Sequence, residues 1–219
     1  MAPFTALVFS ALAAAVASLD LHELVNNPSL SQYQDPKKFI SNESDVYLFR
    51  ASIPADKRRN IEETDIPCVR SRYWGKTTTT VERSYDVYNK TELRNFNSRN
   101  ISLTVDKRDD KTILNVYLKG DVLPVTIQPD INFGLSSEKL NRTFLVLFSD
   151  PNCLILAEKR TNRLNRAWFR CSFWLTQKRI QNPPKCCQFI FELLCAFKDD
   201  SVEFFNDKCL NKTTTPAPV

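Results

Sequence analysis

The chain has 219 residues and a formal net charge of +5, and it contains seven cysteines but a single histidine. About 200 residues remain beyond an apolar leader, enough for one all-β barrel or sandwich with a substantial core. The lone His22 argues against a Ser-His-Asp or Cys-His catalytic site, and the scattered basic residues lack the aromatic interleaving of a nucleic-acid-binding surface.

The N-terminal residues MAPFTALVFSALAAAVASLD hold an apolar run without charge, followed by the A-x-A pattern Ala15-Val16-Ala17. This pattern predicts a secretory signal peptide over residues 1–17, although the usual basic n-region is missing. A signal anchor is the alternative, but the run is shorter than the roughly 20 residues of a membrane span. We expect a secreted protein without membrane insertion, with one domain over residues 18–210 and a disordered Thr/Pro tail over residues 211–219.

Strand-forming runs dominate the domain after one or two short helical turns that precede residue 45. The runs lie at 45–53, 81–89, 101–106, 112–118, 123–128, 144–148, 153–157 and 167–175. Eight or nine strands at meander spacing predict an eight-stranded antiparallel up-and-down barrel, because closure removes exposed sheet edges. The pattern changes after residue 184, where Cys187, Ile190, Phe191 and Leu194 have the spacing of one buried helical face. We expect this C-terminal helix to pack outside the barrel.

Export would place the cysteines in an oxidising compartment, where disulfides are the default. The chain has no C-x-x-C pair, so we expect no metal site. Export also agrees with five N-x-[ST] glycosylation sequons, which begin at Asn42, Asn89, Asn100, Asn141 and Asn211.

Strand pleating assigns faces to the last two strands. If Cys153 points outward, Leu154 and Leu156 point into the barrel. An outward Cys171 likewise sends four neighbours to the interior: Trp168, Arg170, Ser172 and Trp174. Both thiols could then reach the helix that carries Cys186, Cys187 and Cys195.

Four segments together resemble the tick salivary lipocalins: DPKKFISNESDVYLFRAS, DIPCVRS, FLVLFSDPNCLIL followed by CSFWL, and PPKCCQFIFELLC with FFNDKC. That family includes histamine- and serotonin-binding proteins, eicosanoid scavengers and complement inhibitors, and the general lipocalin G-x-W signature is not visible here. The resemblance implies a disulfide-stapled lipocalin barrel with bridges Cys68–Cys209 and Cys153–Cys187. Cys171–Cys195 is then the geometrically sensible third bridge, which leaves Cys186 free or joined to another molecule.

The amine-binding members of that family carry an acidic residue after the strand cysteine and another two residues before the following strand's Trp. The corresponding positions here are Leu154 and Ser172, while the Trp is kept as Trp174. A buried ammonium needs carboxylates to offset its lost hydration, so the resemblance favours an apolar ligand with an anionic head near Arg170. Glu158 shares the face of Leu154 but sits at the strand end, and we do not count it as a replacement acid.

The predicted ligand-binding residues are Leu154, Leu156, Trp168, Arg170, Ser172 and Trp174. An alternative is that the aromatic side chains fill a closed barrel and Arg170 turns outward. The leading functional hypothesis is a secreted, non-enzymatic lipocalin without cofactors that sequesters a small hydrophobic host mediator, fatty-acid- or eicosanoid-like, to suppress inflammation or haemostasis. The alternatives are a lipocalin scaffold whose loops bind a host defence protein such as a complement component, and a binder of histamine or serotonin.

Overall fold

The computed structural model describes residues 28–53, 66–89, 97–108, 111–119, 141–161, 167–196 and 200–210. Within these ranges ten strands form one antiparallel sheet. They are β1 (Val46–Ile53), β2 (Cys68–Ser71), β3 (Tyr73–Lys76), β4 (Val81–Tyr88), β5 (Asn97–Arg108), β6 (Lys111–Lys119), β7 (Asn141–Ser149), β8 (Cys153–Thr161), β9 (Ala167–Thr176) and β10 (Asp200–Glu203).

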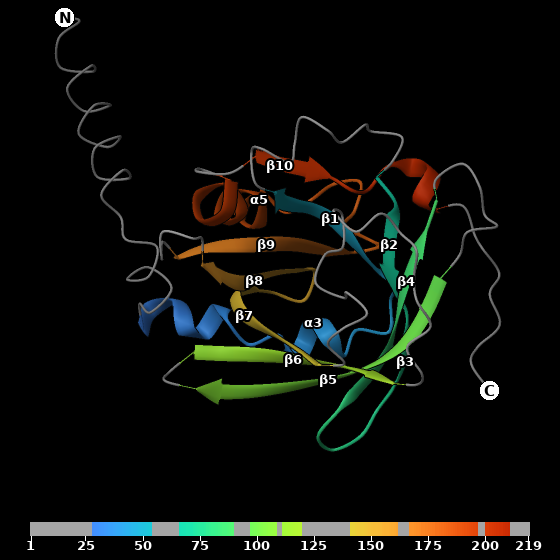
Figure 1. The fold of residues 1–219 in the computed structure, drawn as a ribbon, viewed down its shortest axis with the longest axis horizontal. Helices are drawn as coiled ribbons and strands as arrows, with labels where there is room; N and C mark the ends of the chain where they lie inside the picture. Colours follow the sequence, from blue (N-terminus) through green and yellow to red (C-terminus); the bar gives the residue numbers. More distant parts are fainter. Residues whose placement is uncertain are drawn as a thin grey trace, which may run out of the picture.

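Eight of these strands close into a barrel, as the sequence predicts (Figure 1). The order is β1-β2-β4-β5-β6-β7-β8-β9, and β9 pairs back to β1 through Leu48↔Trp174 and Ala51↔Ser172. A bulge between Leu48 and Arg50 bends β1 at this seam. Two short strands extend the barrel at its margins, since β3 pairs with β4 and β10 pairs with β1.

Three short strands, β2, β3 and β10, were not predicted. β2 and β3 are four residues each, and Arg72 separates them. The backbone N–H of Arg72 donates to Ser84 Oγ, and its carbonyl oxygen accepts from the backbone N–H of Ser84. Runs this short carry little alternation, so the sequence does not reveal them. The predicted strand at 123–128 lies outside the described residues. β6 pairs directly with β7, so the described barrel closes without it.

The two helical turns expected before the first strand are present, as η1 (Pro28–Tyr33) and α3 (Lys37–Ile40). Phe39 and Ile40 of α3 are buried, with 2% and 4% of their surface exposed, and they cover one end of the barrel. The signal peptide predicted over residues 1–17 and the tail predicted over residues 211–219 lie outside the described residues.

The predicted C-terminal helix packs outside the barrel as α5 (Lys185–Phe191), which continues into the π-helical turn η4 (Glu192–Ala196) (Figure 1). Cys187, Phe191 and Leu194 are buried, and Ile190 is half-buried. The ring of Phe191 stacks on Phe173 of β9 with 5.5 Å between centroids. Among the described residues, no helix is long and apolar enough to cross a membrane.

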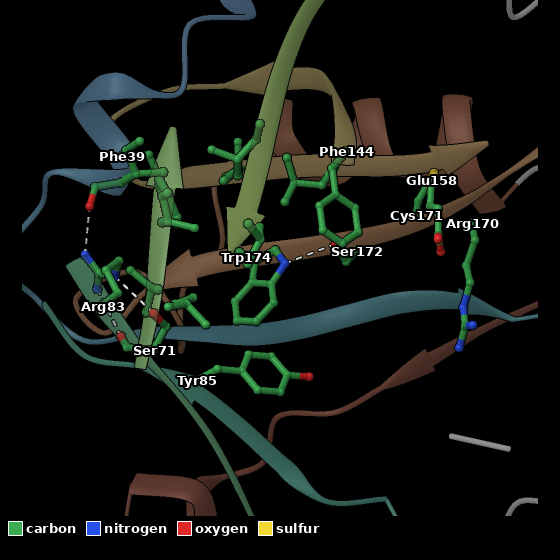
Figure 2. A pocket seen from close by; sticks show the side chains of 18 residues that line it. Phe39, Ser71, Arg83, Tyr85, Phe144, Glu158, Arg170, Cys171, Ser172 and Trp174 are labelled. Carbon is green, nitrogen blue, oxygen red and sulfur yellow. Dashed lines mark hydrogen bonds between the residues drawn. The ribbon is translucent and has the colours of Figure 1, made fainter. Parts of the chain in front are cut away.

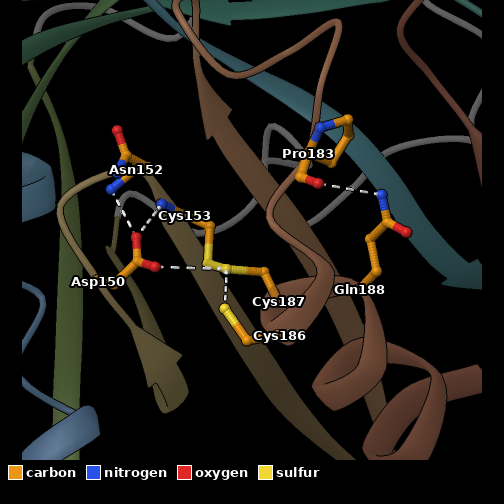
Figure 3. Close-up of a disulfide and its surroundings, with 7 residues drawn as sticks. All are labelled: Asp150, Asn152, Cys153, Pro183, Cys186, Cys187 and Gln188. Carbon is orange, nitrogen blue, oxygen red and sulfur yellow. Dashed lines mark hydrogen bonds between the residues drawn. A yellow bond between two sulfur atoms is a disulfide. The ribbon is translucent and has the colours of Figure 1, made fainter.

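Three disulfides join barrel strands to the C-terminal region: Cys68–Cys209, Cys153–Cys187 and Cys171–Cys195. They are the pairs expected from the resemblance and from strand pleating. Figure 3 shows the second bridge, beside the β7–β8 turn in which Asp150 accepts backbone hydrogen bonds from Asn152 and Cys153.

Cys186 is exposed, and its sulfur lies 3.9 Å from that of Cys187 (Figure 3). Asp150, Cys186 and Cys187 group their potential ligand atoms within 4.8 Å. The sulfur of Cys187 is already bonded to Cys153, so this group offers no thiolate pair to a metal ion.

Candidate functional site

A cavity occupies the interior of the barrel, and the space open to the centres of water molecules within it is about 90 Å³. Its walls come from α3 and from most of the barrel strands (Figure 2). The apolar lining residues are Phe39, Ile40, Val46, Ile101, Leu103, Leu114, Val116, Phe144, Leu154, Leu156, Cys171 and Trp174. The polar lining residues are Ser71, Arg83, Tyr85, Glu158, Arg170 and Ser172.

β8 and β9 present the predicted alternation. Leu154 pairs with Trp174 and Leu156 pairs with Ser172, and all four side chains line the cavity. The indole Nε1 of Trp174 donates a hydrogen bond of 3.0 Å to Ser172 Oγ, which orients the ring across the cavity (Figure 2). The residues between them face outward, where Ile155 and Phe173 are fully buried in the cluster that also contains Phe191 of α5.

Arg170 lines the cavity, and Glu158 is its register partner on β8. Its place among the lining residues agrees with the interpretation in which Arg170 faces the interior. Trp168 lies in β9 opposite Arg160, but its side chain is outside the described part of the chain. The structure thus brings five of the six predicted residues to one wall.

Glu158 also lines the cavity. From the sequence it is not counted as a replacement for the missing acids, because it is expected at the end of its strand. Its Oε1 accepts a hydrogen bond of 2.9 Å from Nη1 of Arg142 on β7, and the two side chains are only 17% and 12% exposed. Pleating alone could have placed Glu158 inside, because it lies four residues beyond Leu154. Arg142 shares the inward face of Phe144 in the same way, but their ion pair depends on the β7–β8 pairing.

Arg83 on β4 closes the cavity at the α3 end, and only 2% of its surface is exposed. Its guanidinium donates five hydrogen bonds of 2.7–3.0 Å to Ser71 Oγ and to the carbonyl oxygens of Ile40, Asn42, Ser44 and Ser71. Burial lowers the pKa of Arg83 to about 10, so it remains charged at neutral pH.

Tyr85 contributes a phenol to the cavity wall (Figure 2). Burial raises its pKa to about 12, and the positive charge of Arg170 opposes that shift. The hydroxyl is therefore neutral at physiological pH and can donate a hydrogen bond. No sequence signal singled out Tyr85 or Arg83, since both belong to a strand without a cysteine landmark.

The charges in and beside the cavity are unequal. Among the lining residues, Arg83 and Arg170 carry guanidinium groups and Glu158 carries a carboxylate, which pairs with Arg142. Leu154 and Ser172, the positions at which amine-binding relatives carry acids by resemblance, both face the cavity without a carboxylate. The two positions at which the resemblance places acids in amine-binding relatives are thus uncharged here.

Comparisons with known proteins agree with this fold. The family model for tick histamine binding protein matches residues 24–211. Japanin from Rhipicephalus appendiculatus, solved with bound cholesterol, has 20% identity and a TM-score of 0.50 over 77% of this chain and 96% of Japanin.

Two further solved structures are similar at lower scores. Apocrustacyanin C2 has 12% identity and a TM-score of 0.44 over 85% of each chain. Insecticyanin from the tobacco hornworm Manduca sexta has 10% identity and a TM-score of 0.43 over 80% of this chain and 82% of its own. No curated protein sequence matches. With the family model spanning nearly the whole described barrel, the chain belongs to the tick histamine-binding protein family and has the lipocalin fold.

Proposed function

We propose that this protein is a secreted, non-enzymatic binding protein that sequesters a small hydrophobic host mediator with an anionic head, such as a fatty acid or eicosanoid. The observation that carries the proposal is a largely apolar barrel interior whose polar lining includes Arg170 and the phenol of Tyr85. Removal of the free mediator would suppress the host response that it triggers.

The lining of the cavity favours an apolar ligand, because twelve of its eighteen residues are apolar. Each methylene that leaves water for this wall contributes about 0.8 kcal/mol. An acyl chain could thus gain most of its affinity from contact with Leu103, Leu156, Trp174 and their neighbours.

The polar contacts would orient the head group. Arg170 offers a planar, two-pronged donor suited to a carboxylate, and the neutral hydroxyl of Tyr85 offers one more. A charge-assisted contact of this kind contributes about 1.5–3 kcal/mol. An amine would have to share the one lining carboxylate, that of Glu158, with Arg142.

Tryptophan fluorescence titrations test the proposal with arachidonate, its uncharged methyl ester, and cholesterol, the ligand in the Japanin structure. We expect submicromolar binding of arachidonate by the unmutated protein. Arg170→Ala should weaken arachidonate by roughly ten- to a hundred-fold while changing the methyl ester little. Lys185→Ala is the matched control, since it removes one positive charge from the exposed start of α5 without touching the cavity.

The outcomes separate the alternatives. If neither arachidonate nor its methyl ester binds, the fatty-acid hypothesis is excluded. Co-purification of a plasma protein with the ligand-free protein would then favour the host-protein alternative. Equal weakening of acid and ester by Arg170→Ala would mean that Arg170 is structural and that the head group lies elsewhere.

A further inference from the structure

Tyr117 is an exposed aromatic residue on the outer face of β6, with 36% of its surface accessible. Its direct cross-strand partner on β7 is Asn141, the first residue of the sequon Asn141-Arg142-Thr143. Directly paired residues face the same side of a sheet, with Cβ atoms about 4.5–5.5 Å apart. An exposed sequon asparagine thus stands beside an exposed aromatic ring.

We propose that Tyr117 is the platform for an N-linked glycan at Asn141, and that the first N-acetylglucosamine packs its apolar C–H face on the phenol ring. An aromatic ring presents a negative face to such C–H groups, which is the same electrostatic preference that governs edge-to-face aromatic pairs. The pairing would bury ring surface that the described barrel leaves in water.

The modification itself follows the general chemistry of the sequon. Sugar C1 forms a bond to Asn141 Nδ2, the bond from C1 to the diphosphate of the lipid-linked oligosaccharide donor breaks, and the amide loses one proton. The Thr143 side chain is exposed beside the site, and its hydroxyl donates a hydrogen bond of 3.1 Å to Asn115 Oδ1, which keeps this face of β6 and β7 polar.

The two other sequons that lie wholly within the described residues, at Asn42 and Asn100, lack this arrangement. Asn42 is half-buried, its Nδ2 donates to the carbonyl of Pro151 at 3.4 Å and its Oδ1 accepts from the backbone of Ser44. Asn100 faces outward on β5, but its direct partner is Lys119, whose ammonium pairs with Glu82 at 2.9 Å. Asn100 is only a diagonal neighbour of Tyr117, about 7–8 Å away, and is half-buried.

The test is a double-mutant cycle on residues 18–219, secreted from a eukaryotic host behind a heterologous leader. Peptide mapping should find Asn141 occupied. Tyr117→Ala should lower the melting temperature of the glycosylated protein by about 2–4 °C, and by less than about 1 °C in the Asn141→Gln background. Tyr117→Phe keeps the ring and should retain the stability. Trimming the glycan to one N-acetylglucosamine with an endoglycosidase should preserve the difference.

Two control variants define specificity. Phe189→Ala removes a ring on α5 that is 64% exposed and has no paired sequon, so its effect should not depend on the glycan. Asn100→Gln should leave the effect of Tyr117→Ala unchanged. An unoccupied Asn141, or a Tyr117→Ala effect of equal size with and without the Asn141 glycan, would overturn the proposal. A coupling that follows Asn100 instead would overturn it as well.

Discussion

Replacement of Arg83 by methionine should loosen the closed end of the barrel. Methionine keeps an unbranched apolar chain in place of the aliphatic part of arginine but ends before the guanidinium, so the change removes all the hydrogen-bond donors. The guanidinium holds the carbonyl oxygens of Ile40, Asn42 and Ser44, which belong to α3 and the turn before β1, against Ser71 of β2. No other side chain can supply five donors in one plane.

The magnitude follows from the acceptors left behind. Ile40 and Ser71 are 4% and 5% exposed, so water cannot readily replace the lost donors at their oxygens. Each orphaned buried acceptor costs about 1–3 kcal/mol, while the acceptors of half-buried Asn42 and Ser44 can be rehydrated at smaller cost. We expect Arg83→Met to lower the free energy of unfolding by about 3–5 kcal/mol, with a fall in melting temperature of about 10 °C.

Urea unfolding followed by tryptophan fluorescence, with the disulfides intact, measures the loss. Arg83→Lys should lose less, because an ammonium keeps the charge but reaches fewer of the carbonyls. Lys107→Met, at an exposed position of β5, is the matched control and should change stability by less than about 0.5 kcal/mol. A cost below about 1 kcal/mol for Arg83→Met would refute the reasoning, since the closed end would then be held by apolar packing of α3 alone.

Three further predictions concern the ligand, the acid range and the disulfides. Histamine and serotonin should bind weakly or not at all in titration calorimetry, because the interior lacks carboxylates at Leu154 and Ser172; submicromolar affinity would contradict this. Burial acts to raise the pKa of Glu82, but hydrogen bonds from Lys119, Ser102 and Thr80 outweigh it and hold that pKa below 4.5. The resulting stabilisation of the fold is present above pH 4.5 and is lost as the pH falls through the lowered pKa. Glu82→Gln should therefore lower the free energy of unfolding at pH 7 and change it much less at pH 3, as measured by urea unfolding. Replacing Cys68 and Cys209 by serine should lower the free energy of unfolding by about 5 kcal/mol, and replacing Cys171 and Cys195 should lower it by about 3.5 kcal/mol. The first loss is larger because the sequence separations of the two bridges are 141 and 24 residues. The reverse order would show that the entropy of the unfolded chain does not dominate.

Local alternation alone determines the faces of β8 and β9. A strand pleat has a period of two residues, so once Cys153 and Cys171 are placed outside, Leu154 and Ser172 must lie inside. The same logic applies to the helical face of α5, whose period of 3.6 residues is visible in one short segment. These features depend only on neighbours in sequence.

The rest of the cavity depended on long-range pairing. Tyr85, Phe144 and Arg83 line the same cavity only because β4, β7 and β9 belong to one closed sheet. No local sequence pattern predicts the order of these strands around the barrel. The pairing of Arg142 with Glu158 likewise joins residues 16 positions apart across two strands. The set of polar and charged groups in a pocket is thus harder to predict from sequence than the inward or outward direction of side chains on a single strand.

The short strands show the same limit. β2, β3 and β10 have four residues each, too few to reveal a period. β10 pairs with a strand about 150 residues earlier in the chain, whereas β3 pairs with β4 in a local hairpin. Arg83 illustrates the physical reason most directly, because its acceptors lie 12 to 43 residues away. By itself the sequence determined which residues alternate and which cysteines face outward, because the side-chain direction in a strand follows from the position along the chain. Only the tertiary structure decided which charges meet inside the barrel, because charged partners come from strands that are distant in the sequence.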